Sequence, residues 1–228
     1  MVKAVMERLT EVMARQRAAR SVEPNRPQRG RAPAPEPVPE FPPDHPLPSS
    51  FDAALRGMVA RPFLASQKWQ EQQWRADREG AHPHILEFEK LLIRRLAKLG
   101  VPMFASELNR SLERQNDLYA LGNSRARAGE SAHQYGCAVD VVHSVHGWNL
   151  GPKGWALVGH VGKELAAQRG LKVTWGGDFA KLWDPAHWEL AEWREVKRLI
   201  DADPVTWPTA KAVYEWKEAD RKARQRLA

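Results

Sequence analysis

The sequence predicts an α+β domain with a small, mainly antiparallel sheet and helices packed on it. Three observations lead to this fold class. Apolar residues follow helical spacing from His84 to Leu99. Short apolar runs typical of strands occur at 101–108 and 136–145. The connections between these segments mix short loops with helices, which is typical of α+β architecture.

The N-terminal part precedes this domain. Residues 1–21 are expected to form a basic amphipathic helix, which either binds a membrane surface or a partner or stays solvated and frays. Residues 22–50 form a Pro-rich linker, since ten prolines between positions 24 and 48 exclude helix and sheet interior alike. We therefore place the start of the domain near Ser50, and the domain at 51–228.

Within the domain, residues 51–80 are expected to be mostly helical, and the segment QKWQEQQW serves either packing or docking. The stripe from His84 to Leu99 predicts a longer helix that Gly100 ends. The other expected elements are helices at 112–121, 154–169, 192–200 and 208–226, and strands at 101–108, 136–145, 171–175 and 186–190.

Composition excludes several classes of protein. The net charge of +7 would attract polyanions. However, residues 1–31 carry eight Lys and Arg side chains against three acids, so no specific nucleic acid partner is expected for the domain.

No apolar run reaches the roughly 20 residues of a membrane helix. The N-terminus lacks the apolar core of a signal peptide, so synthesis in the cytoplasm is expected. The single cysteine, Cys137, excludes an internal disulfide and is interpreted as a small buried side chain.

Two stretches contain residues that can bind a metal ion. Ser131–Asp140 and Asp184–Glu189 together offer the imidazoles of His133 and His187 and the carboxylate of Asp140. Three protein ligands with a fourth position open are typical of a hydrolytic zinc site. Gly136 lets the backbone turn between His133 and Asp140. The alternative is that these are ordinary half-buried histidines and a carboxylate at a strand end.

These stretches resemble the zinc peptidases that cut bacterial cell-wall peptides. This family includes D-alanyl-D-alanine carboxypeptidases, D-Ala-D-Ala dipeptidases and the L-alanyl-D-glutamate endopeptidases that phages use as endolysins. The resemblance runs from Leu86 to Leu190 and also rests on Asn109-Arg110-Ser111, Gln115 and Trp175-Gly176-Gly177-Asp178-Phe179. Asp184, three residues before the last histidine, is typical of the endolysin branch, whereas the other branches more often have Glu.

The resemblance implies a hedgehog/DD-peptidase-like fold and a Zn²⁺ ion held by His133, Asp140 and His187. It implies hydrolysis of a peptidoglycan stem peptide by metal-activated water, with the L-Ala–D-Glu bond as the expected target and the cell wall as the place of action. Terminal D-Ala-D-Ala cleavage is the alternative reaction. A third alternative is a non-catalytic module that binds cell wall or nucleic acid through a basic, Trp-rich surface.

The general base has two candidates. In a regular strand Glu189 would point to the same face as His187, while Asp184 lies beside Pro185 in an expected bend. Spacing alone leaves the choice open, and the resemblance places the base at Asp184.

The resemblance also gives roles to three polar residues. It implies that Arg110 stabilises the carbonyl oxygen during attack, and that Gln115 and Ser131 line the substrate cleft. The residues before the arginine, Leu108-Asn109, depart from the usual Gly-Tyr of the family.

Two further expectations concern the tryptophans and the partners. Trp175, Trp183 and Trp188 surround the second stretch and form either an apolar wall beside the substrate or part of the core. The chain is expected to act as a monomer on stem peptides, with a membrane or virion partner for the N-terminal helix.

Overall fold

The computed structural model describes residues 44–227. The expected N-terminal helix and residues 22–43 of the Pro-rich linker lie outside the described residues. The helices are α2 (Asp52–Met58), α3 (Arg61–Leu64), α4 (Gln67–Gln73), α5 (Pro83–Lys98), α6 (Leu112–Ala120), α7 (Gly151–Arg169), α8 (Trp193–Ala202) and α9 (Ala210–Leu227). The strands are β1 (Met103–Glu107), β2 (Ala138–His143), β3 (Val173–Trp175) and β4 (His187–Leu190). Short 3-10 turns are η1 (Ser49–Phe51), η2 (Ala132–Tyr135) and η3 (Gly176–Asp178).

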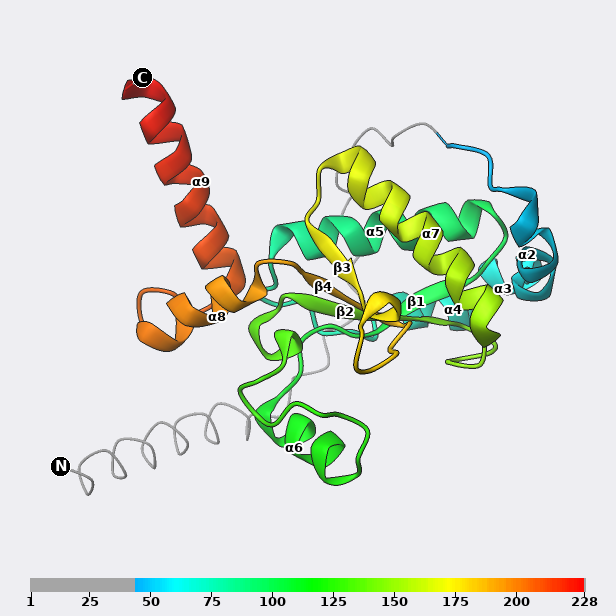
Figure 1. Cartoon of the computed structure of the whole chain (residues 1–228), viewed down its shortest axis with the longest axis horizontal. Coiled ribbons are helices and arrows are strands. Elements are labelled where there is room, and N and C mark those ends of the chain that lie inside the picture. The colour runs from blue at the N-terminus through cyan, green and yellow to red at the C-terminus, as the bar shows by residue number, and fades with distance from the viewer. Residues whose placement is uncertain (1–43, 228) are drawn as a thin grey trace. The chain divides into compact units, whose positions relative to one another are not determined.

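The four strands form one antiparallel sheet in the order β1-β2-β4-β3. Helices α5 and α7 run across one face of this sheet (Figure 1). The predicted α+β class with a small antiparallel sheet is therefore confirmed. Within residues 44–227 the elements expected for the domain appear, although the expected strands are longer than the observed ones by one to four residues.

Helix α5 is the central packing helix, and its sequence explains its bounds. Pro83 occupies the first turn, where its missing N–H costs nothing, and Nδ1 of His82 accepts a hydrogen bond from the His84 N–H at 3.2 Å. Its buried side chains are Ile85, Phe88, Glu89, Leu91, Leu92, Ile93, Arg95 and Leu96. The chain leaves the helix at Gly100 with φ 88°. This apolar stripe is the one that the sequence predicts.

Strand alternation gives the sheet two different faces. Val139 pairs with Trp188, which is fully buried and packs on Phe88 of α5 with ring centroids 4.7 Å apart. The next pair along the same two strands is Asp140 and His187. Successive side chains point to opposite faces of a sheet, so Asp140 and His187 face away from the α5 side.

The segment before α5, expected to be mostly helical, forms three short helices, α2, α3 and α4. The side chain of Ser66 accepts from the Trp69 N–H at the start of α4. The indole N–H of Trp69 and the amide of Gln73 both donate to the Met103 carbonyl at 3.2 Å. Of the two alternatives for this Trp- and Gln-rich segment, packing against β1 is the one that these contacts favour.

Residues just before η1 also contact the domain. Asp44 lies 3.1 Å from Arg95 and 3.0 Å from Lys98, and Arg95 donates to the carbonyl of His45. The described end of the linker is thus attached to α5. Within residues 44–227, no helix has the length and apolar character needed to cross a membrane.

Candidate metal centre

Three strands bring polar side chains into one row across the sheet. Asp140 on β2 lies between Glu107 on β1 and His187 on β4, directly opposite both. A bulge between Ala105 and Glu107 shifts the register of β1 just before this row. Bulges re-aim side chains and are common beside active sites.

His133 reaches the same point from η2, immediately before β2. The turn starts with a capping box, in which Ser131 and Gln134 satisfy each other's backbone N–H groups. It ends at Gly136, which has φ 61°, and a side chain at this position would collide with the backbone of Ala81. Glycine is therefore required here, and the turn fixes His133 over the start of β2.

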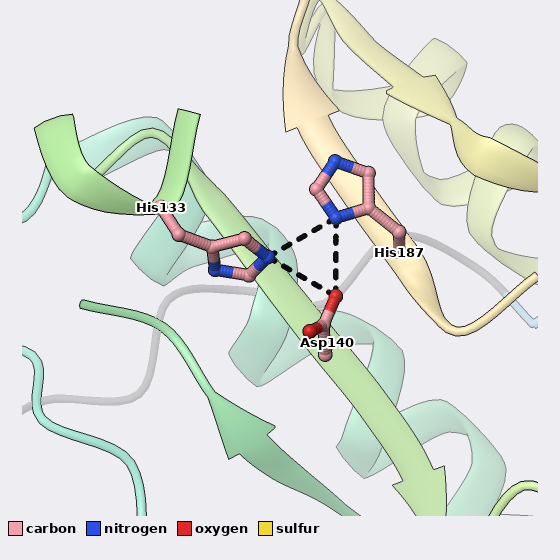
Figure 2. A group of neighbouring side chains, drawn as sticks. All are labelled: His133, Asp140 and His187. Carbon is pink, nitrogen blue, oxygen red and sulfur yellow. Dashed lines mark hydrogen bonds and ion pairs between the residues drawn. The ribbon is translucent and has the colours of Figure 1, made fainter. Parts of the chain in front are cut away.

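The three predicted ligand residues meet at one point (Figure 2). Nε2 of His133 lies 3.1 Å from Nδ1 of His187 and 3.2 Å from Oδ1 of Asp140. Nδ1 of His187 lies 3.1 Å from the same carboxylate oxygen. Both histidines are buried, and the Asp140 side chain is 15% exposed. The three side chains are therefore largely shielded from solvent.

The outer polar atom of each of these residues is bonded to a protein group that fixes its orientation. Nδ1 of His133 lies 2.8 Å from the Leu108 carbonyl, which can only accept, so this nitrogen carries a proton. Nε2 of His187 lies 3.1 Å from Oε2 of Glu189. Oδ2 of Asp140 accepts from Arg110 at 3.1 Å. The inner atoms are consequently left to face one another.

This donor set fits a small divalent cation. Tetrahedral zinc with bonds of about 2.0–2.1 Å places neighbouring ligand atoms about 3.3 Å apart, close to the distances of 3.1–3.2 Å seen here. Two neutral imidazoles with their outer nitrogens protonated and one carboxylate would present three lone pairs to one another. Such an arrangement requires a positive charge at the shared point.

The electrostatics of the site agree with that requirement. Burial opposes ionisation of Asp140, but the neighbouring His133 and His187 outweigh it and hold the pKa of this carboxyl well below its usual range. Burial also opposes protonation of His187, yet its bonds to Asp140 and Glu189 raise the pKa of His187 to about 10. The site thus stabilises positive charge where the three residues meet.

Asp184 and Glu189, the two candidate bases, have different surroundings. Both carboxylate oxygens of Glu189 are occupied, one by His187 and the other by the indole N–H of Trp193 at 3.1 Å. Within the described part of the chain, the Asp184 carboxylate makes no hydrogen bond. Burial, and then the nearby charge of Asp140, raise the pKa of Asp184. Glu189 is therefore attached to the far side of the His187 ring, whereas Asp184 is free to accept a proton.

Arg110 lies behind Asp140 rather than open to a substrate. Its side chain is 8% exposed and donates to Glu107, Gln115 and Asp140. This geometry favours a positioning role over the direct contact with a carbonyl oxygen that the resemblance implies.

Gln115 and Ser131 also bind protein groups. Gln115 is fully buried, and its amide accepts from Arg110 and donates to Ser124 and the Ala126 carbonyl. Ser131 is 9% exposed and caps η2. In this structure they hold Arg110, η2 and the loop after α6 in place.

Sequence reasoning missed Glu107 and the role of Glu189. Glu107 binds Arg110 through Oε2 at 2.8 Å, and its position opposite Asp140 depends on the bulge in β1. The spacing of Glu107 and Arg110, three residues apart, was the available signal. The interaction of Glu189 with the outer nitrogen of His187 could have been suspected from strand alternation, which places residues i and i+2 on one face.

Comparisons with known proteins show what the part of the chain around this site is similar to. A family model described as D-alanyl-D-alanine carboxypeptidase matches residues 124–190. The peptidoglycan L-alanyl-D-glutamate endopeptidase CwlK of Bacillus subtilis (strain 168) is 28% identical over 127 residues, covering 48% of this chain and 72% of the relative.

Two solved structures are also similar. The Serratia marcescens L-Ala D-Glu endopeptidase ChiX is 27% identical, with a TM-score of 0.43, over 57% of this chain and 91% of that one. The LdcB LD-carboxypeptidase is 23% identical, with a TM-score of 0.36, over 59% of this chain and 78% of that one.

The matched segment 124–190 contains η2, β2, β3 and β4, and with them His133, Asp140, Asp184 and His187. It excludes Arg110 and Gln115, so the comparison bears on the metal centre and its neighbouring carboxylate. The segment that matches this family model thus contains the three-residue centre suited to a cation, and the chain is similar over residues 124–190 to D-alanyl-D-alanine carboxypeptidases.

Proposed function

We propose that this protein is a zinc-dependent peptidoglycan peptidase that hydrolyses the L-alanyl–D-glutamate bond of the stem peptide. The observation that carries the proposal is the set of three inner atoms, on His133, Asp140 and His187, which face one another at 3.1–3.2 Å. A free carboxylate, that of Asp184, lies within electrostatic range of them. This combination serves hydrolysis and has no use in a module that only binds.

The ion is proposed to be Zn²⁺, held by Nε2 of His133, Nδ1 of His187 and Oδ1 of Asp140. Two imidazoles and one carboxylate form a borderline-soft donor set that suits zinc better than calcium or magnesium, which prefer oxygen ligands. A bound Zn²⁺ lowers the pKa of water to about 7 and polarises a carbonyl group. Three protein ligands leave the fourth position for these groups.

Asp184 is proposed to move the proton during hydrolysis. A general base must take a proton from water and deliver it to the leaving amine. Burial and the charge of Asp140 raise the pKa of Asp184, which makes the carboxylate a stronger base than an exposed aspartate. Glu189 is already bonded on both oxygens, so it is proposed to orient His187.

Arg110 is proposed to hold the carboxylate of Asp140 in its ligating orientation. It binds the oxygen that does not face the centre, while Gln115 holds the other side of the guanidinium. Its positive charge beside the site would also favour a substrate carbonyl oxygen that gains negative charge. Ser131 contributes by capping the turn that carries His133.

Three observations bear on which bond is cut, and two of them favour the L-alanyl–D-glutamate bond. The Bacillus relative at 28% identity is an L-alanyl-D-glutamate endopeptidase, and an aspartate stands three residues before the last histidine, as in the endolysin branch. The description of the matching family model instead favours terminal D-Ala-D-Ala cleavage, which is the second candidate.

The proposed setting is lysis of a bacterial wall by an endolysin-like enzyme. A single chain supplies all the residues of the centre and Asp184, so a monomer is sufficient for the reaction. A membrane or virion partner for residues 1–21, which lie outside the described residues, stays part of this proposal.

The test is digestion of purified peptidoglycan by the zinc-loaded protein, with products identified by mass spectrometry. Endopeptidase action would release peptides that begin with D-Glu and leave L-Ala on the glycan. Carboxypeptidase action would release free D-alanine and leave the rest of the stem peptide attached. His133→Ala is expected to abolish the release, whereas the control His160→Ala, a histidine on α7 outside the centre, is expected to retain it. No product from wild-type protein with zinc bound would refute the proposal.

A further inference from the structure

The loop between η3 and β4 exposes an indole on the residue that precedes the proposed base in the chain. Leu182 is 40% exposed and Trp183 is 55% exposed. Asp184 follows immediately in the chain. Large apolar side chains that gather on a surface next to a catalytic group are often part of a binding site.

The three tryptophans of this region differ in burial: two lie in the core and one is exposed. Trp175 and Trp188 are buried and stack on each other with centroids 5.9 Å apart, so they belong to the core. Within the part of the chain that the structure describes, Trp183 has neither a hydrogen bond nor a ring contact. The packing of the domain therefore does not account for an indole at this position.

Contacts at the base of the loop fix where the indole is presented. The Gly176 carbonyl accepts from the N–H of Phe179 at 3.2 Å and from that of Asp184 at 3.1 Å. A side chain at Gly176 would overlap the carbonyl of Asp184, so the two ends of the loop approach closely only because this residue is glycine. The indole N–H of Trp175 donates to the Pro185 carbonyl at 2.8 Å. Trp183 thus projects from a loop whose two ends are held together.

We propose that Trp183, with Leu182, is a specificity surface that packs against the sugar ring to which the stem peptide is attached. This inference rests on the proposed function. Sugar rings have apolar C–H faces, and an aromatic side chain with an indole N–H suits such a face with polar edges. The occupant is therefore the glycan side of the substrate, not the free end of its peptide.

The position of the scissile bond supports this occupant. In a stem peptide only one residue, L-Ala, separates the sugar's lactyl group from the L-Ala–D-Glu bond. One extended residue spans roughly 3.5 Å, and adjacent Cα atoms, such as those of Trp183 and Asp184, lie about 3.8 Å apart. With the L-Ala–D-Glu bond at Asp184, the sugar would then lie within reach of Trp183, the residue before it. For terminal D-Ala-D-Ala cleavage four residues intervene, which spans roughly 14 Å, and the sugar would be out of reach.

The experiment compares two soluble substrates with the same peptide. One carries the disaccharide on L-Ala, and the other is the free stem peptide. For the zinc-loaded wild-type protein we expect kcat/KM to be higher for the sugar-bearing substrate.

In Trp183→Ala the ratio of the two kcat/KM values is expected to fall roughly tenfold. Trp183→Phe is expected to retain most of the ratio, because it keeps an aromatic face. Trp216→Ala on α9, which also removes a partly exposed indole, is the matched control and is expected to leave the ratio unchanged.

The ratio separates substrate contact from general damage. A loss in Trp183→Ala that is equal for both substrates would mean that the indole acts on the peptide or on Asp184, and would overturn the inference. A ratio unchanged from wild type would overturn it as well. Should the wild-type protein cleave neither substrate, the proposed function itself would fail, which is a distinguishable result.

Discussion

The two ring nitrogens of His187 have different partners. This difference gives different roles to Asp184 and Glu189, the two carboxylates that lie close to His187 in the sequence. Nδ1 faces the centre with Asp140, whereas Nε2 is bonded to Glu189. A carboxylate on the outer nitrogen of a ligating histidine fixes its tautomer and raises its basicity. Glu189 and Asp184 should therefore respond differently to neutralisation.

Asp184→Asn is expected to retain the metal and lose most of the activity. The change removes a proton acceptor but no ligand, and general acid–base catalysis contributes about 10²–10⁴-fold. It also removes a charge that lies near Asp140, so the metal-free variant should be at least as stable as wild type. The measurements are kcat on peptidoglycan fragments, zinc content by mass spectrometry and the melting temperature. Wild-type turnover with zinc bound would exclude Asp184 as the base.

Glu189→Gln is expected to weaken metal binding rather than remove catalysis. The amide oxygen can still accept from His187, but the negative charge that supports the ligand is lost. Loss of such an outer partner costs about 10–100-fold in metal affinity. The affinity is measured by competition with a chelating dye, and turnover should recover at saturating zinc. Activity that stays lost at saturating zinc would instead make Glu189 part of the proton transfer.

At the scale of whole elements, α7 packs on the sheet so closely that two of its residues must be glycine. A side chain at Gly159 would overlap the ring of Trp175, and one at Gly162 would overlap the ring of Trp188. Trp175 and Trp188 are side chains of β3 and β4. The loop with Asp184 joins these two strands, and β4 also carries the proposed ligand His187. The distance between helix and sheet therefore affects the position of the centre.

Gly162→Ala is expected to destabilise the protein although alanine is the better helix former. The helix gains up to about 1 kcal/mol from the exchange, but overpacking against Trp188 costs about 1–3 kcal/mol or more. The free energy of unfolding in urea tests this. Gly57→Ala on α2 is the control, because nothing lies within 4 Å of the added methyl group, and it should be neutral or slightly stabilising. Equal effects of the two changes would contradict this account of α7.

His82 connects the start of α5 with α9 and makes this contact sensitive to acid. Its side chain is 3% exposed and lies 5.0 Å from the ring of Tyr214. Burial, then the charges of His84 and Lys217, lower the pKa of His82 to about 4. Because an unfolded histidine has a pKa of 6.5, the unfolded chain binds the proton more readily between these values.

Stability is accordingly expected to fall as the pH drops from about 6.5 to about 4. The contribution of His82 amounts to about 3 kcal/mol, fully present above pH 6.5 and lost near pH 4. Urea unfolding at pH 7 and pH 4.5 measures it. In His82→Asn, which can still cap α5, the difference between the two pH values should shrink by about this amount. A pH dependence that His82→Asn leaves unchanged would assign the acid sensitivity to other groups.

At the scale of the whole domain, the core and the candidate metal centre lie on opposite faces of the sheet. The largest fully buried side chains include Trp155, Trp188, Phe88, Ile85 and Leu92, and none of them depends on a ligand. The domain is therefore expected to fold without the ion.

Removal of metal by a chelator is expected to abolish activity and to keep the far-UV circular dichroism. Binding of an ion at 100 times its Kd stabilises a protein by about 2.7 kcal/mol. The melting temperature should consequently fall by roughly 5–10 °C and return when zinc is added. Loss of the circular dichroism signal in the chelated protein would show that the ion is structural.

The sequence alone determined the main elements and the residues that can bind a cation. The apolar stripe of α5, the stop at Gly100 and the strong apolar centre of β2 are local patterns, and local patterns fix secondary structure and strand alternation. His133, Asp140 and His187 were predicted as ligands because their residue types can bind a cation and because their stretches resemble those of a zinc peptidase family; spacing alone left ordinary histidines as the alternative.

Only the tertiary structure decided how the polar groups around these residues are used. The bonding of Glu189 to the outer nitrogen of His187, and of Arg110 to the outer oxygen of Asp140, depends on side-chain directions set by strand register and by the bulge in β1. The separation of Trp183 from the core tryptophans likewise depends on packing against α7. Such contacts join residues far apart in the chain, and their geometry follows from long-range packing that spacing does not encode.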